Sequence, residues 1–213
     1  MKYHQPVLSK IQASKNLFGL FLACWFLINL VQALFTEINA DEAYYVLYGE
    51  NLAWGYFDHP PLVGLLTFLG AKLFSGNLAA RFFTVLLQPI TLWMVWKIID
   101  KKEVTNTKVR LFFIIAASLV MFSAYGFITT PDVPLLFFTA LFLYVYKNFL
   151  EKQNLGNSLF LSICMAGLVY SKYQGVILIG LVVLSNLKLL TLSLRVSIIA
   201  YLTYFIISFS HFD

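Results

Sequence analysis

Residues 39–61 read NADEAYYVLYGENLAWGYFDHPP, and this stretch decides how the rest of the chain is interpreted. It gathers four acidic residues, one of the three histidines and four of the twelve tyrosines of a chain that is 60% hydrophobic. Long apolar runs precede and follow it. Acidic groups beside a bilayer are costly and tend to be retained for a purpose, so the stretch predicts a functional loop at one face of a membrane.

The composition excludes an ordinary soluble domain. Charged residues make up 12% of the chain and the mean hydropathy is +0.80, whereas soluble domains have about 25% charged residues. The net charge of +5 does not indicate a nucleic-acid partner, because the basic residues sit at the ends of apolar segments, as topology signals do. Cys24 and Cys164 lie inside apolar runs and indicate neither a disulfide framework nor a metal cluster. The expected class is an all-α polytopic transmembrane protein.

The apolar runs predict one transmembrane domain that covers residues 1–213. Spans are expected at 17–35, 78–99, 111–128, 133–146 with its flanks, and 192–209. Two shorter runs, 159–170 and 176–187, are separated by a polar turn. They predict a cavity within the protein, because non-helical backbone is tolerated at membrane depth only where lipid does not reach it.

Residues 36–77 are expected to form an outer active-site loop that contains interfacial helices. Asn39 is expected to cap the first of these helices, with Glu42 completing a capping box and Gly55 ending the helix. A second interfacial helix is expected at 62–74, a segment too short and too interrupted by glycine and lysine for a span.

The basic residues predict the orientation of the chain. If the amino terminus is cytoplasmic, twelve of the fifteen basic residues fall on the inside, as the positive-inside rule requires. Lys72, Arg81 and Lys172 are left outside, together with seven of the ten acids. We therefore expect a multi-pass protein of the cytoplasmic (inner) membrane, with its acidic loop on the outer side.

Several polar residues have two interpretations each. Asp41 and Glu42 are either first-turn acids stabilised by the helix dipole or candidates for chemistry beside the bilayer. Asp58 and His59 precede two prolines and offer an oxygen and an imidazole, which suit a divalent metal ion or a phosphate; a satisfied interfacial histidine is the alternative.

The outer cations and the remaining acid also have two interpretations each. Arg81 at the outer end of a span either binds an anion or snorkels to the lipid headgroups. Lys172 needs an anionic partner, and a lipid phosphate and Asp132 are equal candidates. Asp132 follows Thr-Thr-Pro and either caps the next helix or belongs to the site.

Five ordered motifs support a more specific hypothesis. They are the acidic pair 41–42, YFDHPPL at 56–62, Ala-Arg at 80–81, TPDVPL at 130–135 and SKY at 171–173. Together they resemble the protein O-mannosyltransferase-like family of integral-membrane glycosyltransferases, which includes the lipid A aminoarabinose transferases. The resemblance spans roughly residues 17–187. It implies a helical bundle of the C-type glycosyltransferase kind, of which this chain is expected to be the amino-terminal part.

The resemblance implies roles for the matching residues. Asp41 is implied as the catalytic base or acceptor-orienting carboxylate and Glu42 as its support, while Arg81 and Lys172 are implied as ligands of the lipid phosphate.

The remaining matches imply further contacts with the substrate, its phosphate or a metal. Asp58 and His59 occupy the place of an acidic and a basic residue near the phosphate or a metal, and Asp132 matches a loop acid. His59 stands where the aminoarabinose branch has lysine, which is a departure from that branch.

The resemblance implies an enzyme that moves a sugar, with inversion, from a polyprenyl-phosphate donor to a hydroxyl of a protein, lipid A or glycan acceptor. A carboxylate takes the hydroxyl proton and cations stabilise the departing phosphate. A divalent metal ion is the one cofactor considered. The alternatives are a transporter or flippase, whose charges would line a pathway, and an inactive truncated glycosyltransferase. Polar groups at one face and the lack of a visible repeat in the sequence favour the enzyme over the transporter.

Overall fold

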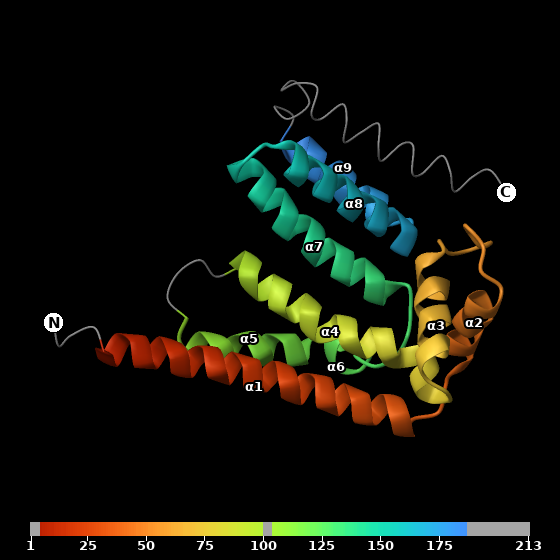
Figure 1. The fold of residues 1–213 in the computed structure, drawn as a ribbon, viewed down its shortest axis with the longest axis horizontal. Helices are drawn as coiled ribbons and strands as arrows, with labels where there is room; N and C mark the ends of the chain where they lie inside the picture. Colours follow the sequence, from red (N-terminus) through yellow and green to blue (C-terminus); the bar gives the residue numbers. More distant parts are fainter. Residues whose placement is uncertain (1–4, 100–103, 187–213) are drawn as a thin grey trace.

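The computed structural model describes residues 5–99 and 104–186, and the regular structure of these residues is entirely helical (Figure 1). The helices are α1 Gln5–Phe35, α2 Ala40–Glu50, α3 Leu62–Leu73, α4 Asn77–Ile99, α5 Asn106–Ser118, α6 Val120–Ser123, α7 Asp132–Glu151, α8 Leu155–Ser171 and α9 Gly175–Ser185. Within the described residues, α4, α7 and the part of α1 from residue 11 onward are long and apolar enough to cross a membrane. The expected all-α membrane bundle is confirmed.

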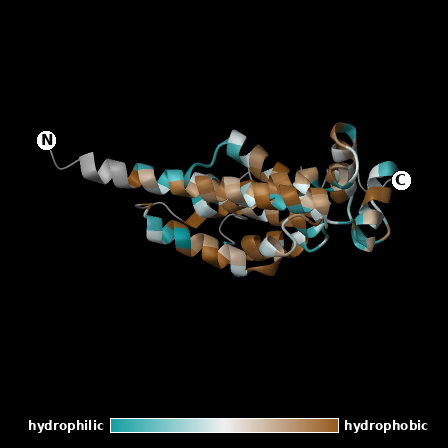
Figure 2. Ribbon diagram, turned by 90° about the horizontal axis from the view of Figure 1, so that it is seen from below, coloured by the Kyte–Doolittle hydropathy of each residue, from teal (hydrophilic) through white to brown (hydrophobic). Residues whose placement is uncertain are grey.

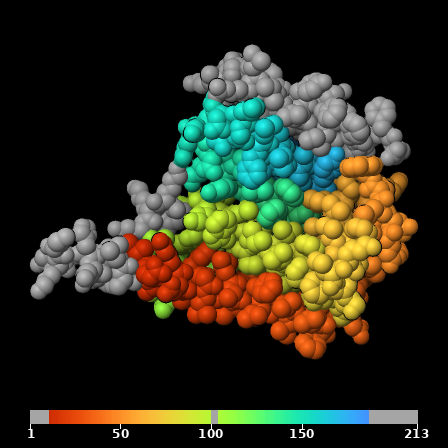
Figure 3. Space-filling view, in the orientation of Figure 1, coloured from red at the N-terminus to blue at the C-terminus, as the bar shows by residue number. Residues whose placement is uncertain are grey.

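The long helices lie in the order α1, α4, α7, with α8 and α9 beyond α7 (Figure 1). Hydrophobic residues predominate along these helices, as Figure 2 shows. Helices α2 and α3 pack on each other and run across the long helices at the end where α1 stops and α4 starts (Figure 1). Figure 3 shows that these two helices cover that end of the bundle. The polar stretch of the sequence is therefore folded as a cap on one end of an apolar bundle.

The caps of α2 confirm one prediction and correct another. Asn39 is the N-cap with a complete capping box: its Oδ1 accepts from Glu42 N at 2.9 Å, and its own N donates to Glu42 Oε2 at 3.3 Å. The prediction that the helix runs to Gly55 is wrong, because α2 ends at Glu50. The chain turns back there, and the Tyr56 hydroxyl donates to Tyr48 O at 2.7 Å, satisfying a carbonyl that no further helical turn covers.

Helices α2 and α3 touch backbone to backbone through two glycines. A Cβ on Gly49 would lie 2.8 Å from Phe68 N, and a Cβ on Gly64 would lie 2.9 Å from Tyr48 Cβ. Thr67 Oγ1 also donates to Tyr45 O at 3.0 Å. No larger side chain fits at either glycine without moving a helix, so α2 and α3 form one rigid unit.

The predicted spans agree with the structure except at one place. Segments 17–35, 78–99 and 133–146 lie within α1, α4 and α7, and the interfacial helix 62–74 corresponds to α3. The two short runs correspond to α8 and α9, and the polar turn between them is confirmed at 172–174. The predicted span 192–209 lies outside the described residues.

The predicted continuous span 111–128 is wrong. Helix α5 ends at Ser118, Leu119 is extended, and after the single turn of α6 the chain is non-helical up to α7. Tertiary contacts hold this segment: Thr129 Oγ1 lies 2.7 Å from Thr84 Oγ1 and donates to Ala80 O at 2.8 Å. The Met121 carbonyl also accepts from Gln88 Nε2 of α4 at 3.4 Å. These contacts with α4 hold the chain away from a straight helix.

Candidate active site

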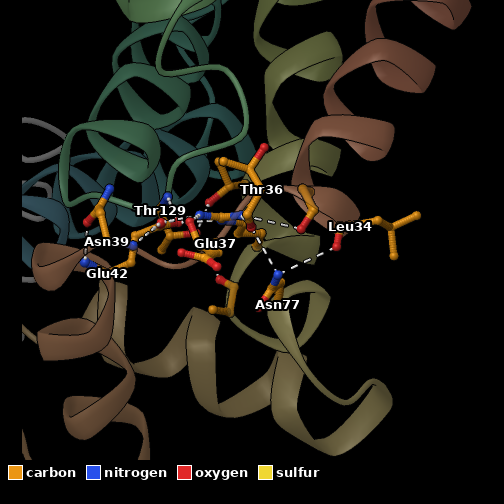
Figure 4. A network of polar contacts seen from close by, with 11 residues as sticks. Leu34, Thr36, Glu37, Asn39, Glu42, Asn77 and Thr129 are labelled. Carbon is orange, nitrogen blue, oxygen red and sulfur yellow. Dashed lines mark hydrogen bonds and ion pairs between the residues drawn. The ribbon is translucent and has the colours of Figure 1, made fainter.

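The two adjacent acids at the start of α2, Asp41 and Glu42, lie in different environments because of the helical twist. Successive helical residues point about 100° apart, and here Glu42 turns inward while Asp41 turns outward. Glu42 is 0% exposed, and its carboxylate accepts from Arg81 Nε at 2.7 Å, Thr129 N at 3.0 Å and Asn39 N at 3.3 Å. A further contact joins Glu42 Oε2 to Arg81 Nη2. The carboxylate thus joins α2, α4 and the segment before α7 (Figure 4).

Arg81 is as buried as its partner. It is 1% exposed, and beyond Glu42 it donates to carbonyls in the last turn of α1 and just after it: Nη1 to Ala33 O at 3.4 Å and to Thr36 O at 2.6 Å, and Nη2 to Glu37 O at 2.9 Å. Asn77 Nδ2 bonds the same Thr36 O at 2.9 Å (Figure 4).

A guanidinium has five N–H donors, and these contacts use all five. Snorkelling of Arg81 to the headgroups is therefore wrong for this structure. Direct binding of a phosphate by Arg81 stays a prediction, but the guanidinium has no unused donor here.

Asp41 has the opposite environment. Its side chain is exposed, and within the described residues it makes no hydrogen bond and no ion pair. Since Glu42 holds four hydrogen bonds and Asp41 holds none with the described residues, Asp41 is the member of the pair whose oxygens can accept a proton from another molecule.

A second polar cluster surrounds Asp58 on the loop between α2 and α3. Asp58 Oδ1 accepts from the hydroxyl of Tyr44 at 3.2 Å and from that of Tyr48. His59 Nε2 lies 3.6 Å from Asp58 Oδ2 and 3.5 Å from the Tyr45 hydroxyl. The hydrogen bond from Tyr48 holds the pKa of Asp58 below its ordinary value. The cluster therefore keeps Asp58 ionised and fixes it against α2.

The hydroxyl of Tyr45 lies in the electrostatic field of three candidate acids. Burial raises the pKa of its hydroxyl above the ordinary value, and the fields of Asp41, Asp58 and Asp132 each raise it further. These carboxylates come from the start of α2, the following loop and the start of α7. Charges that lie up to ninety-one positions apart in the chain therefore act on one hydroxyl.

Asp132 and Lys172 form an ion pair beside this cluster. Lys172 Nζ donates to Asp132 Oδ1 at 2.8 Å, with both side chains partly exposed. The interpretation of Asp132 as a helix cap is wrong, because the N-cap of α7 is Pro131 and Asp132 stands in the first turn. Of the two partners considered for Lys172, the structure shows Asp132. An ammonium has three donors, so the pair leaves two for a further anion.

An apolar pocket of about 460 Å³ adjoins the polar residues. Its lining comes from the chain after α2, from the start of α3 and from Tyr170, two residues before Lys172. On the α2 side Leu52 and Trp54 line it, and Pro61 and Leu62 line it from α3. An apolar pocket of this kind suits the hydrocarbon part of a ligand, and the chain continues from its lining residue Tyr170 to the cation Lys172.

The metal prediction remains open. Within residues 5–99 and 104–186 no group of three or more histidine, cysteine, aspartate or glutamate side chains is placed to hold an ion. Asp58 and His59 provide two adjacent side chains, and two tyrosines already occupy Asp58 Oδ1. His59 Nδ1 is buried and has no hydrogen-bond partner among the described residues. A divalent ion at Asp58 and His59 therefore stays a prediction.

The Tyr48 hydrogen bond predicts a pH dependence. A carboxylate whose pKa is lowered in the folded state adds stability above its unfolded pKa, about 4, and loses it as the pH falls through the folded value. Tyr48→Phe removes the first cause of the lowered Asp58 pKa. The variant is therefore expected to lose stability at pH 7 and to approach the wild type below about pH 4. Thermal unfolding in detergent at several pH values measures this, with Tyr125→Phe as the control; a Tyr48→Phe deficit that is the same at every pH would contradict it.

Two groups at this site were not predicted from the sequence. Thr129, whose N–H donates to Glu42, entered only as part of the Thr-Thr-Pro stretch before Asp132, and no role at the site was predicted for the tyrosines at 44, 45 and 48. A run of three tyrosines at helical spacing beside an Asp-His pair was the available signal for the second group.

Three comparisons with known proteins bear on this arrangement. A family model described as dolichyl-phosphate-mannose-protein mannosyltransferase matches residues 58–212, well over half of the chain. The matched range contains the Asp58–His59 pair, Arg81, Asp132 and Lys172, and it begins after the acid pair of α2. Comparisons with curated proteins and with solved structures found no match.

Proposed function

Because the chain belongs to the dolichyl-phosphate-mannose-protein mannosyltransferase family, a family of membrane glycosyltransferases, we propose that it transfers a sugar from a polyprenyl-phosphate donor to a hydroxyl acceptor. The structural observation that supports the proposal is that Glu42 is buried and hydrogen-bonded while the neighbouring Asp41 is exposed. The Glu42 carboxylate accepts hydrogen bonds from Arg81, Thr129 and Asn39, whereas Asp41 is exposed and, like Asp58 and Asp132, acts electrostatically on Tyr45. Asp41 is the proposed general base.

The proposed reaction is a single displacement. The acceptor oxygen attacks the anomeric carbon, and the bond from that carbon to the phosphate oxygen breaks. The polyprenyl phosphate leaves with the bonding electrons, and Asp41 takes the proton of the acceptor hydroxyl. Attack from the side opposite the leaving group inverts the anomeric centre. No nucleotide is needed, since the donor arrives activated in the membrane.

The departing phosphate needs a cation near it. We assign this role to Lys172, which has two donors beyond its bond to Asp132 and lies two residues from the apolar pocket. Asp132 holds the ammonium in place, and the pocket is proposed to receive part of the lipid chain. His59 lies in the adjoining cluster and is a second candidate contact of the phosphate. Arg81 contributes indirectly, because it fixes Glu42 and hence the start of α2.

The family description narrows the substrates to be tried first. It names a lipid-linked mannose and a protein, so mannosyl transfer to a protein hydroxyl is the first donor and acceptor pair. Lipid A and other glycans are further acceptors to try. With the amino terminus in the cytoplasm, twelve of the fifteen basic residues fall on the inside, which supports the proposal that the reaction takes place on the outer side of the membrane.

The test is an assay of donor consumption. Membranes that contain the full chain are incubated with polyprenyl-phosphate mannose and with polyprenyl phosphates of other sugars, and the released polyprenyl phosphate and sugar product are quantified. Consumption of a donor that depends on an acceptor and is lost in Asp41→Asn supports the proposal. If the inserted and folded chain consumes no donor, the proposal fails. Movement of the lipid across the bilayer without sugar transfer would favour a flippase.

Lys172→Ala is expected to weaken binding of the donor phosphate about 10- to 100-fold. The reason is that one hydrogen bond to a charged group contributes about 1.5–3 kcal/mol. Affinity for a polyprenyl phosphate in detergent measures it. Lys152→Ala is the matched control, because Lys152 follows the other end of α7. Equal affinity of the wild type and Lys172→Ala would make Lys172 a structural partner of Asp132 and no more.

A further inference from the structure

A second apolar groove lies between α1 and α5, at a distance along α1 from the polar cap. Its volume is about 570 Å³. The floor is part of the protein core: Phe113 is buried, and its ring centroid lies 4.9 Å from that of Phe21 and 6.1 Å from that of Trp25. The edges are Leu20 and Ile114, each more than half exposed. The groove is thus a furrow with a rigid floor on the surface of the bundle.

One end of the furrow carries an unpaired cation. Arg110 lines the groove near the start of α5 and is exposed, and it forms no hydrogen bond or ion pair with any residue that the structure describes. The same end of the bundle is joined by the contact of Ser14 Oγ with Asn106 Oδ1 at 2.7 Å. This is the end opposite α2 and α3 (Figure 1). The positive-inside rule assigns it to the cytoplasmic leaflet, whose lipids are partly anionic.

The furrow also has the length of one leaflet. Its lining on α1 runs from Leu17 to Ile28, which at about 1.5 Å per residue is about 16 Å. Half of a hydrocarbon core about 30 Å thick is about 15 Å. An acyl chain that follows the furrow from the Arg110 end would therefore reach about the bilayer midplane.

We infer that this furrow binds one anionic phospholipid of the leaflet at the Arg110 end, with its headgroup phosphate on Arg110 and one acyl chain along the floor. The charge at one end, the apolar lining and the length fit such a lipid. A zwitterionic lipid would leave the guanidinium without a net anionic partner. The site is separate from the proposed active site and does not depend on the proposed function.

Trp25 provides a probe, because it lines the furrow. The full chain is reconstituted in bilayers with phosphatidylglycerol or phosphatidylcholine brominated in the acyl chain. Quenching by bromine is then compared between the wild type and Trp25→Phe, which isolates the signal of this tryptophan. We expect brominated phosphatidylglycerol to quench Trp25 at a mole fraction about five-fold lower than brominated phosphatidylcholine, as expected for one cation near an anionic lipid.

Two pairs of variants test the assignment. Arg110→Gln is expected to abolish the preference for phosphatidylglycerol, while Lys15→Gln, an exposed cation on α1 outside the furrow lining, keeps it. Ala117→Phe fills the furrow and should lower quenching by both lipids, while Ile115→Phe, on the same helix outside the lining, should not.

Three outcomes of the quenching experiments would overturn the inference. They are a preference that survives Arg110→Gln, a preference that Lys15→Gln removes equally, and quenching that Ala117→Phe leaves unchanged. Disulfide formation between Cys24 side chains of two chains in the bilayer, with the furrow closed to lipid, would identify a second copy as the occupant and would also overturn it.

Discussion

Asp41→Asn is expected to lower the rate of sugar transfer by about 10² to 10⁴, the usual contribution of a general base. Asparagine has the shape of aspartate but cannot take the acceptor proton. Because the Asp41 side chain is exposed and bonds to no described residue, the substitution removes no contact that the structure shows. The initial rate of transfer from a saturating polyprenyl-phosphate sugar measures the effect, together with thermal unfolding to show that the fold is unchanged.

The control for this substitution lies on the same helix. Glu50→Gln removes an exposed acid from the last position of α2 and is expected to leave the transfer rate within about two-fold, since surface changes away from a site have small effects. If Asp41→Asn transferred sugar at the wild-type rate, Asp41 would have no part in the chemistry, and the carboxylates at 58 and 132 would become the next candidates.

Glu42→Ala is expected to destabilise the protein by about 3–5 kcal/mol, the effect of removing one partner of a buried ion pair. The substitution leaves the buried guanidinium of Arg81 without its carboxylate and leaves Thr129 N without an acceptor. Unfolding in detergent measures the loss. Asp41→Ala, one residue away and exposed, is the matched control, and its effect is expected to stay within about 0.5 kcal/mol.

A double-mutant cycle separates this pair from the rest of the site. Arg81→Met with Glu42→Ala should cost less than the two single substitutions added together, because the second removes the charge that the first left unpaired. Strict additivity would show that the two side chains do not stabilise each other. Equal and small losses for Glu42→Ala and Asp41→Ala would show that the buried network does not hold α2.

Most of the helical framework could be predicted from the sequence, because it rests on local signals. The apolar lengths of α1, α4 and α7 and the capping box at Asn39 each depend on residues close together in the chain. The break after Ser118 could not be predicted in this way. Residues 111–128 contain no charged residue and no proline, and the interruption depends on contacts with Thr84 and Ala80, which come from another helix.

For the site residues too, the sequence predicts what depends on local signals and not what depends on tertiary contacts. Two adjacent acids in a first helical turn have equal status in the sequence, and the partners at 81 and 129 decide which of them is buried. Likewise, the sequence identified Lys172 as a cation in need of an anion, and the position of α7 relative to α8 selects Asp132. What the sequence could not supply is the direction in which each side chain points.

The hydrogen bonds of Glu42 also determine when α2 can dock on the bundle during synthesis of the chain. Its partners follow it by 39 and 87 positions, so they leave the ribosome well after α2 does. Until Arg81 and Thr129 have been made and inserted, the carboxylate has no protein donors beyond the cap and must stay in water. Docking of α2 against the bundle is therefore a late step of biogenesis, and the cap can close only on a bundle whose fourth and seventh helices are being put in place.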